Sequence, residues 1–378
     1  MSQASIPAQF WRGGTSKALV FRECDLPTDP AARDAIFLGA MGSPDDNGRQ
    51  LNGMGGGMSS LSKVCILGPS SHPDADVDYT FVQVPVGAGA VDYSSNCGNM
   101  SSAMGPAALD LGMVPPPQGN EAVVRIHNTN TGKVIVARFP ADGGRFDPRG
   151  DFRIDGVSGS GSAVRLEFLA PGGAKTGRLL PTGRAVDMLT LADGTNCAAS
   201  CIDAANPCVF VDAATLGKTG LELPDALEGD AAFLHRIEQI RQAASVAMGL
   251  TPDLGAAAAG QSLPKVAMVS AAADGAVLSG ALLAAADHSI AIRMMSMGRP
   301  HRAVPVTGAI CLAVAARLPG TIPAMIAGAT PGALVVGHPS GTLTVDADVT
   351  SDTDKVTARS GTVYRTARKL FAGEVWHC

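Results

Sequence analysis

The sequence NCGNMSS at residues 96–102 marks the point where the chain changes from a strand pattern to a helix pattern. Alternating apolar residues over 81–86 predict a strand before it, and apolar residues recurring every three or four positions over 100–109 predict a helix after it. Asn96 is a typical helix-capping residue, which places Cys97 at or near the first helical position. The stretch therefore predicts a helix that begins at a cysteine.

A thiol at a helix start has particular chemistry. It faces unpaired backbone N–H groups and the positive end of the helix dipole, and both favour the thiolate form of Cys97. Gly98 lets another backbone segment or a ligand approach closely, and the same helix start can bind a carboxylate. Two interpretations stay open on these residues alone: a titratable thiol beside an anion site, or a small buried cysteine in a helix rich in alanine and glycine.

The composition predicts two globular domains. With 378 residues the chain is too long for one typical domain. Hydrophobic residues make up 46% and charged residues 17%, so a large core is available and global disorder is excluded. The 45 glycines and 25 prolines predict many short strands joined by tight turns, with a few alanine-rich helices between them.

Several classes of protein are excluded. The net charge of −5, with scattered lysines and arginines, argues against a nucleic-acid surface. The first residues lack the pattern of a signal peptide, and the most apolar run, 303–318, is too short to span a bilayer. The eight cysteines show no disulfide-scaffold spacing, so we expect reduced thiols in a cytoplasmic protein. Cys197, Cys201 and Cys208 fit no common zinc pattern, and we predict no metal site.

The two halves of the chain show the same order of patterns. Each has strands, an amphipathic helix, further strands and then an apolar helix with a small polar residue and a glycine at its start, Cys97-Gly98 in one half and Thr307-Gly308 in the other. A turn-rich link at 178–184 predicts one domain over 1–184 with 366–378, and a second over 185–365. Two helix starts at a cleft between such halves would suit a ligand with two or more carboxylates.

Three further segments carry polar residues that could contact such a ligand. The segment RGGTSK at 12–17 combines two glycines, two hydroxyls and two cations, although on these residues alone a simple β-turn is the favoured interpretation. Lys63 follows a glycine-rich run and opens a strand, where a solvated strand end is the alternative. The segment GHPSG at 337–341 places His338 and Ser340 in a tight turn, which is either structural or a carboxylate-binding loop.

Taken together, these segments are similar to one known family. They are RGGTSK at 12–17, SKV at 62–64, NCGN at 96–99, MGRPHRA at 297–303, TG at 307–308, GHPSG at 337–341 and RTAR at 365–368. The chain resembles, over nearly its whole length, the 2-methylaconitate cis-trans isomerase family, which includes 4-oxalomesaconate and 3-methylitaconate isomerases and has a diaminopimelate-epimerase-like fold.

The resemblance implies an α+β fold of two pseudo-symmetric domains. Each would be a curved, mostly antiparallel sheet, or half-barrel, around a central helix, with the active site in the cleft. The resemblance implies that the reaction needs neither a metal nor an organic cofactor. It also implies that Lys63 and Cys97 are the acid/base pair. Related amino-acid epimerases use two facing cysteines, and Thr307 stands where the second would be, which favours an isomerase with one thiol and one lysine.

The predicted activity is a cofactor-independent 1,3-proton shift in a small unsaturated tri- or dicarboxylate, of the 4-oxalomesaconate or 2-methylaconitate type. Pathways that degrade aromatic acids or propionate both stay open, and a homodimer is a further expectation. The alternatives are an amino-acid racemase or epimerase, and an accessory protein that binds a polycarboxylate without converting it. We predict that the following residues contact the substrate: Arg12, Thr15, Ser16, Lys17, Asn96, Gly98, Asn99, Met100, Arg293, Met297, His301, Thr307, Gly308, His338 and Ser340.

Overall fold

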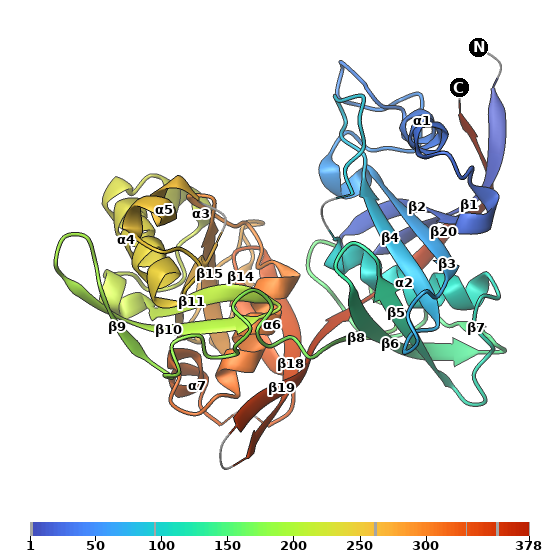
Figure 1. Cartoon of the computed structure of the whole chain (residues 1–378). Coiled ribbons are helices and arrows are strands. Elements are labelled where there is room, and N and C mark those ends of the chain that lie inside the picture. Colours follow the sequence, from blue (N-terminus) through green and yellow to red (C-terminus); the bar gives the residue numbers. More distant parts are fainter. Residues whose placement is uncertain (1–2, 94–95, 261–262, 330, 353–354, 378) are drawn as a thin grey trace. The chain divides into compact units, whose positions relative to one another are not determined.

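A computed structural model of the chain describes residues 3–93, 96–260, 263–329, 331–352 and 355–377 (Figure 1). The chain forms two compact units, the first made of Met1–Glu167 and Tyr364–Cys378 and the second of Phe168–Val363. The first connection lies inside strand β8 (Val164–Leu169), earlier than the expected boundary at residue 184. The physical reason is hydrogen bonding, because the N–H groups of Ala170 and Gly173 donate to the carbonyls of Arg359 and Asp203 in the second unit.

The first unit is built on a mostly antiparallel sheet. Four pairs of strands are antiparallel: β1–β2, β1–β20, β3–β4 and β5–β6. Two pairs are parallel: β2–β3 and β4–β5. The first and last strands of the chain are therefore neighbours in this sheet. The bounds are β1 Ala4–Gly13, β2 Ser16–Arg22, β3 Lys63–Pro69, β4 Val77–Gln83, β5 Glu121–Asn128, β6 Lys133–Asp142, β7 Arg145–Phe146 and β20 Ala367–His377.

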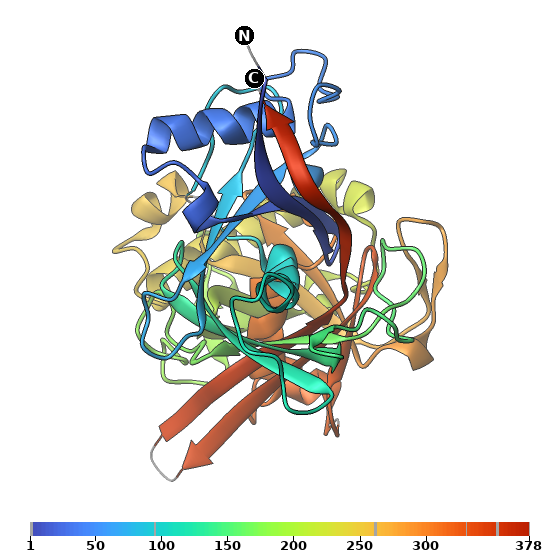
Figure 2. The same cartoon turned by 90° about the vertical axis from the view of Figure 1, so that its right-hand side faces the viewer.

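Helix α2 (Gly98–Asp110) is the centre of this unit. Every residue from Met100 to Leu109 is buried, and most of them are small, so strands can approach the helix from several sides. The helix contacts β1, β2, β3, β5, β6, β7 and β20, and Figure 2 shows it end-on. The sheet's other face is covered by α1 (Pro30–Met41), which is capped by Asp29 and buries Phe37 and Met41 against strand residues.

The second unit repeats this plan. Its strands pair antiparallel in β9–β10, β10–β11, β12–β15, β17–β18 and β18–β19, and parallel in β11–β12 and β15–β17. Helix α6 (Val306–Ala316) is buried from Gly308 to Ala315 and contacts β10, β11 and β18. The strand bounds are β9 Asp187–Thr190, β10 Asn196–Ala204, β11 Asn206–Asp212, β12 Lys265–Ala271, β13 Gly275–Ala276, β14 Leu282–Leu283, β15 Ile290–Ser296, β16 Arg299–Pro300, β17 Leu334–His338, β18 Gly341–Asp352 and β19 Lys355–Arg365.

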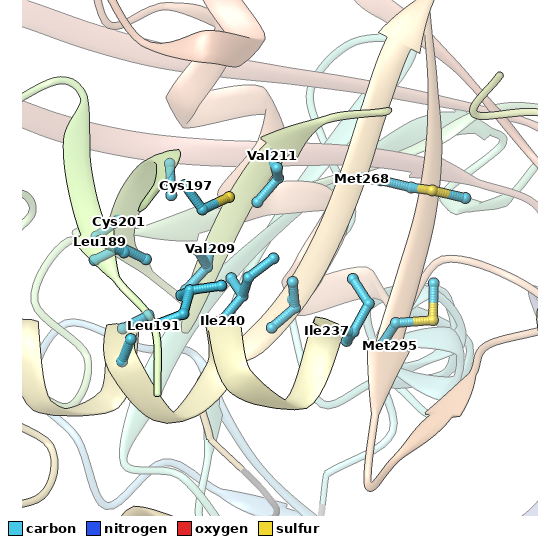
Figure 3. Close-up of a cluster of buried hydrophobic side chains, with 14 of the residues drawn as sticks. Leu189, Leu191, Cys197, Cys201, Val209, Val211, Ile237, Ile240, Met268 and Met295 are labelled. Carbon is cyan, nitrogen blue, oxygen red and sulfur yellow. The ribbon is translucent and has the colours of Figure 1, made fainter. Parts of the chain in front are cut away.

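An amphipathic helix covers the other face of the second sheet. Helix α4 (Ala231–Ala247) turns Ile237 and Ile240 toward the strands, where they join the apolar cluster drawn in Figure 3. Cys197 and Cys201 belong to the same cluster, which confirms them as core residues. The shorter helices are α3 Pro224–Glu228, α5 Leu254–Ala259 and α7 Ile322–Ala327.

The predicted fold class is confirmed: the protein is α+β, and each unit wraps a mostly antiparallel sheet around one buried helix. Among the helices of the described residues, none has the length and apolar character needed to cross a membrane. Within the same residues, no three His, Cys, Asp or Glu side chains gather as ligands for a metal ion.

Candidate active site

The start of α2 lies one residue later than predicted. Cys97, not Asn96, is the N-cap residue, and the helix begins at Gly98. The Asn96 side chain is engaged elsewhere, because its Oδ1 accepts a hydrogen bond of 3.2 Å from Asn128 Nδ2. Among the residues that the structure describes, no side chain caps the first turn of α2, which leaves its leading N–H groups available to a ligand beside the Cys97 thiol.

The β1–β2 hairpin packs against this helix start. The half-buried Cys97 Sγ lies 3.9 Å from the hydroxyl of Ser16, which is 3% exposed. A Cβ added at Gly13 would lie 2.7 Å from the Asn99 carbonyl oxygen, and one added at Gly14, where φ is +52°, would lie 2.3 Å from Asn99 Oδ1. The two glycines of RGGTSK are therefore explained by close contact between hairpin and helix.

Asn99 joins three segments of the first unit. Its Nδ2 donates to Thr15 Oγ1 at 3.1 Å, and its Oδ1 accepts from Arg365 Nε at 3.1 Å. The hairpin, the helix start and the last residue of β19 are thus fixed to one another by a single amide side chain. Gly14 N–H adds a bond of 2.9 Å to the carbonyl of Thr366.

Lys63 opens strand β3 and is 7% exposed. Its Nζ donates to Gln83 Oε1 at 2.5 Å and lies 5.1 Å from the centre of the Phe81 ring. Gln83 Nε2 donates in turn to the carbonyls of Ser59 and Ser62, which fixes the amide with its oxygen toward the lysine. The structure therefore holds Lys63 with a neutral partner and, in the described part of the chain, without a carboxylate partner.

A buried thiol connects the surroundings of Lys63 and Cys97. Cys65, on the same strand as Lys63, lies 3.8 Å from the Tyr79 hydroxyl. Burial raises the pKa of Cys65 far above its usual range, a rise to which a charge on the Cys97 thiol would add and which the positive charge of Lys63 opposes. Cys65 therefore interacts electrostatically with both side chains and stays protonated at neutral pH. The sequence around Cys65 did not indicate this position.

Arg365 was quoted only as part of the RTAR segment and was missed as a site residue. It is 9% exposed, and burial lowers its pKa to about 10, an effect that a negative charge on Cys97 would oppose. Its Nη1 donates to the Tyr364 carbonyl at 3.0 Å. A cation, a thiol and the open N–H groups of a helix therefore share one region of the first unit.

Two predicted cations of the hairpin have partners within the protein. Arg12 Nη1 donates to the Gly14 and Thr366 carbonyls and to Thr366 Oγ1, and the arginine lines a cavity of about 410 Å³ together with Arg368. Lys17 places its Nζ 5.6 Å from the centre of the Phe10 ring. Both side chains stabilise the hairpin, and their predicted contact with substrate stays a prediction.

Met100 is fully buried in α2, so its side chain belongs to the core of the first unit rather than to a ligand surface. Arg293 is likewise buried, and its guanidinium donates to the carbonyls of Leu221, Glu222 and Ile292. Its donors hold the backbone together. We therefore leave these two side chains out of the site proposed below.

The other predicted residues of the second unit flank α6 or lie in the turn after β17. Thr307 is half-buried in the first turn of α6, and Gly308 is buried against Met294. Cys311 lies one turn further along the helix, fully buried, with Sγ 3.6 Å from the Ile202 carbonyl oxygen. Burial raises the pKa of Cys311 well above its usual range, so it is unsuited to serve as a second exposed thiol.

The remaining four side chains have distinct surroundings. Burial, with the nearby charge of Lys265, lowers the pKa of His301 to about 4. The Ser340 N–H donates to His338 Nδ1 at 3.1 Å, and the Ser340 hydroxyl donates to the Arg302 carbonyl at 2.6 Å. Met297 is 60% exposed, at a φ of +53°. All four residues belong to the second unit.

Cavity volume does not mark the reactive residues. A cavity of about 920 Å³ is lined by residues of the 42–52 loop together with Trp376 and His377, and neither Lys63 nor Cys97 borders it. The chemistry instead points to the start of α2, where a thiol, hydroxyls and open N–H groups come together near a buried amine. Such an arrangement suits proton transfer on an anionic ligand.

Comparison with known proteins identifies the family of this chain. The model of the PrpF protein family matches residues 3–377. The 2-methyl-aconitate isomerase of Cupriavidus necator is 40% identical over 384 residues, covering 99% of this chain and 97% of the relative. The 4-oxalomesaconate tautomerase of Pseudomonas putida is 38% identical over 378 residues, with 99% and 97% covered. A crystal structure of a methylitaconate-delta-isomerase, 37% identical, superimposes with a TM-score of 0.90 and covers 100% of this chain and 96% of that one. The chain therefore belongs to the PrpF protein family, and it is an isomerase.

Proposed function

We propose that the protein moves a carbon–carbon double bond in a small unsaturated tri- or dicarboxylate, with Lys63 and Cys97 as the acid/base pair. The relatives named above act, by their names, on 2-methylaconitate, 4-oxalomesaconate and methylitaconate. The observation that carries the proposal is the start of α2, with Cys97 as the N-cap residue, together with a buried Lys63 whose amine donates to the neutral Gln83 side chain.

The proposed reaction is a 1,3-proton shift. One of the pair removes a proton from the carbon next to the alkene, and the electron pair delocalises through the alkene into a carboxylate or keto group. The other member returns a proton at the far end of the allyl system, so the double bond moves and no electrons are gained or lost. A neutral amine and a thiolate both suit this work when positioned within hydrogen-bond reach of the carbon acid.

The developing negative charge needs donors that are already in place. The N–H groups at the start of α2 point toward the N-cap region, and the Ser16 hydroxyl lies 3.9 Å from the thiol. Thr15 is held in the same hairpin by Asn99. These groups would bind the carboxylate that accepts charge during the reaction, without a metal or an organic cofactor.

The test is proton NMR in D₂O with the purified protein, EDTA and four acids: oxalomesaconate, 2-methylaconitate, methylitaconate and aconitate. We expect fast double-bond migration and deuterium uptake for one of them. Lys63→Ala and Cys97→Ser should each lower the rate at least about 100-fold, whereas the exposed counterparts Lys133→Ala and Cys24→Ser should not change it. An unchanged turnover rate in the Lys63 or Cys97 variant would contradict the proposal that these two residues form the acid/base pair.

The same experiment separates the two alternatives. A racemase or epimerase would exchange the α-proton of an amino acid and would need a second reactive thiol, a role for which the buried Cys311 is poorly placed. A binding protein would hold a polycarboxylate without deuterium uptake. The predicted homodimer is checked by light scattering, and a monomer at micromolar concentration would contradict it.

A further inference from the structure

Arg365 is a buried cation whose surroundings differ from those of the other buried arginines. The side chains of Arg241, Arg293 and Arg365 are all at least nine-tenths buried. Arg241 pairs with Glu238 at 2.5 Å and donates to two backbone carbonyls, and Arg293 donates to three carbonyls. These two guanidinium groups are satisfied by the protein itself.

Arg365 uses only part of its hydrogen-bonding capacity. Nε donates to Asn99 Oδ1 and Nη1 to the Tyr364 carbonyl. A guanidinium has five N–H donors, and within the described residues no bond uses Nη2 and no carboxylate pairs with the group. Nη2 is also accessible to solvent, because it is not one of the fully buried side-chain atoms that lack a hydrogen-bond partner.

A buried charge without a partner is costly, so proteins normally pair it or use it to bind a ligand. Here the ligand would have to be anionic, and the planar fork of a guanidinium matches a carboxylate with two parallel hydrogen bonds.

The position of the group indicates which anion it serves. Its aliphatic stem passes beside Gly14, since a Cβ added there would lie 3.2 Å from Arg365 Cδ. Asn99 connects it to Thr15 and to the first turn of α2, directly after Cys97. The unused donors therefore belong to the same region as the thiol and the open helix N–H groups.

We propose that Arg365 binds a substrate carboxylate beside Cys97 with its free Nη donors, and so selects acids that carry a carboxylate next to the shifting double bond. The inference rests on the proposed isomerase function. The bound carboxylate is the one into which charge spreads when the proton leaves, so Arg365 contacts substrate in the ground state and interacts more strongly with it as charge develops. Asn99 is then a positioning residue that sets the guanidinium plane.

The experiment compares Arg365→Met and Arg365→Lys with the matched control Arg125→Met, an exposed arginine on β5. The substrates are the acid that the wild type converts fastest and its monoamides, in each of which one carboxylate is a carboxamide. We expect Arg365→Met to lower kcat/KM for the acid about 100-fold or more, and Arg365→Lys to lower it less. The wild type should have a similarly lowered kcat/KM for one of the monoamides. Arg365→Met should have the same kcat/KM for that monoamide as for the acid, because it lacks the guanidinium.

Chemical rescue separates contact with substrate from a structural role. Added guanidinium ion should restore turnover to Arg365→Ala but leave Arg125→Met and the wild type unchanged. If Arg365→Met alters the fold, near-ultraviolet circular dichroism shows it, and rescue together with the lysine variant still decides the question. Arg365→Met that discriminates among the monoamides as the wild type does, or the absence of rescue in a folded Arg365→Ala, would overturn the inference. A wild type that converts none of the acids would instead overturn the proposed function.

Discussion

Substituting Gly14 by alanine tests whether close packing between hairpin and helix builds the site. The new Cβ would lie 2.3 Å from Asn99 Oδ1, so the Asn99 side chain must move, and the residue must keep a φ of +52°. An L-residue in the left-handed region costs about 1–2 kcal/mol. Loss of the Asn99 bonds to Thr15 and Arg365 adds about 1 kcal/mol for the neutral bond and about 2 kcal/mol for the charged one.

The sum predicts that Gly14→Ala lowers the free energy of unfolding of the first unit by about 4 kcal/mol. Gly132 provides a matched control, because it has a φ of +64° and an added Cβ there would meet nothing within 4 Å. Gly132→Ala should therefore cost only about 1–2 kcal/mol. Both tryptophans, Trp11 and Trp376, belong to the first unit, so urea unfolding followed by tryptophan fluorescence reports on that unit.

Equal losses in Gly14→Ala and Gly132→Ala would refute the reasoning, because they would show that backbone strain alone explains the effect. Activity gives a second readout. Gly14→Ala should also raise KM for the substrate acid, since Asn99 can no longer orient Arg365, whereas Gly132→Ala should leave KM unchanged.

Three other predictions follow from the buried polar groups. Gln83→Ala should lower kcat about tenfold or more by releasing Lys63, with a loss of only about 1 kcal/mol in unfolding free energy, and an unchanged kcat would contradict this. His301 has a folded pKa of about 4, below its unfolded value of 6.5. Its contribution to the free energy of unfolding is therefore complete above pH 6.5 and falls by about 1–2 kcal/mol, after allowing for partial exposure, as the pH drops toward 4. His301→Gln should remove this part of the pH dependence in urea titrations. Arg241→Met should destabilise the second unit by about 3–5 kcal/mol because Glu238 loses its partner, and the double variant with Glu238→Gln should recover part of the loss, which thermal unfolding would detect.

The parts of the site that short segments encode could be predicted from the sequence. The pattern around NCGN predicted the helix and its cysteine, the repeated order of patterns predicted two similar halves, and the family resemblance implied the fold class. The start of α2 was placed one residue early, because the local preference of Asn96 for a helix cap is overridden by its hydrogen bond to Asn128, a contact between distant positions.

Side chains whose role depends on long-range packing could not be assigned in this way. Nothing in the sequence around Arg293 says that its donors meet the carbonyls of Leu221 and Glu222. Nothing around Cys65 says that it lies near both Lys63 and Cys97, and Arg365 is separated from its partner Asn99 by most of the chain. Burial and pairing, rather than residue type, decide which arginine is structural and which is available to a ligand.

The pairing of β1 with β20 has a consequence for how the protein is made. The first unit takes strands from both extremes of the described chain, and Arg365 and Thr366, which complete the surroundings of the hairpin, immediately precede β20. The first sheet cannot close until β20 has been synthesised and is free to pair with β1. Because residues 168–363 precede this strand, the surroundings of Cys97 are completed only after the whole second unit has been synthesised, and a chain that stops before residue 365 lacks them.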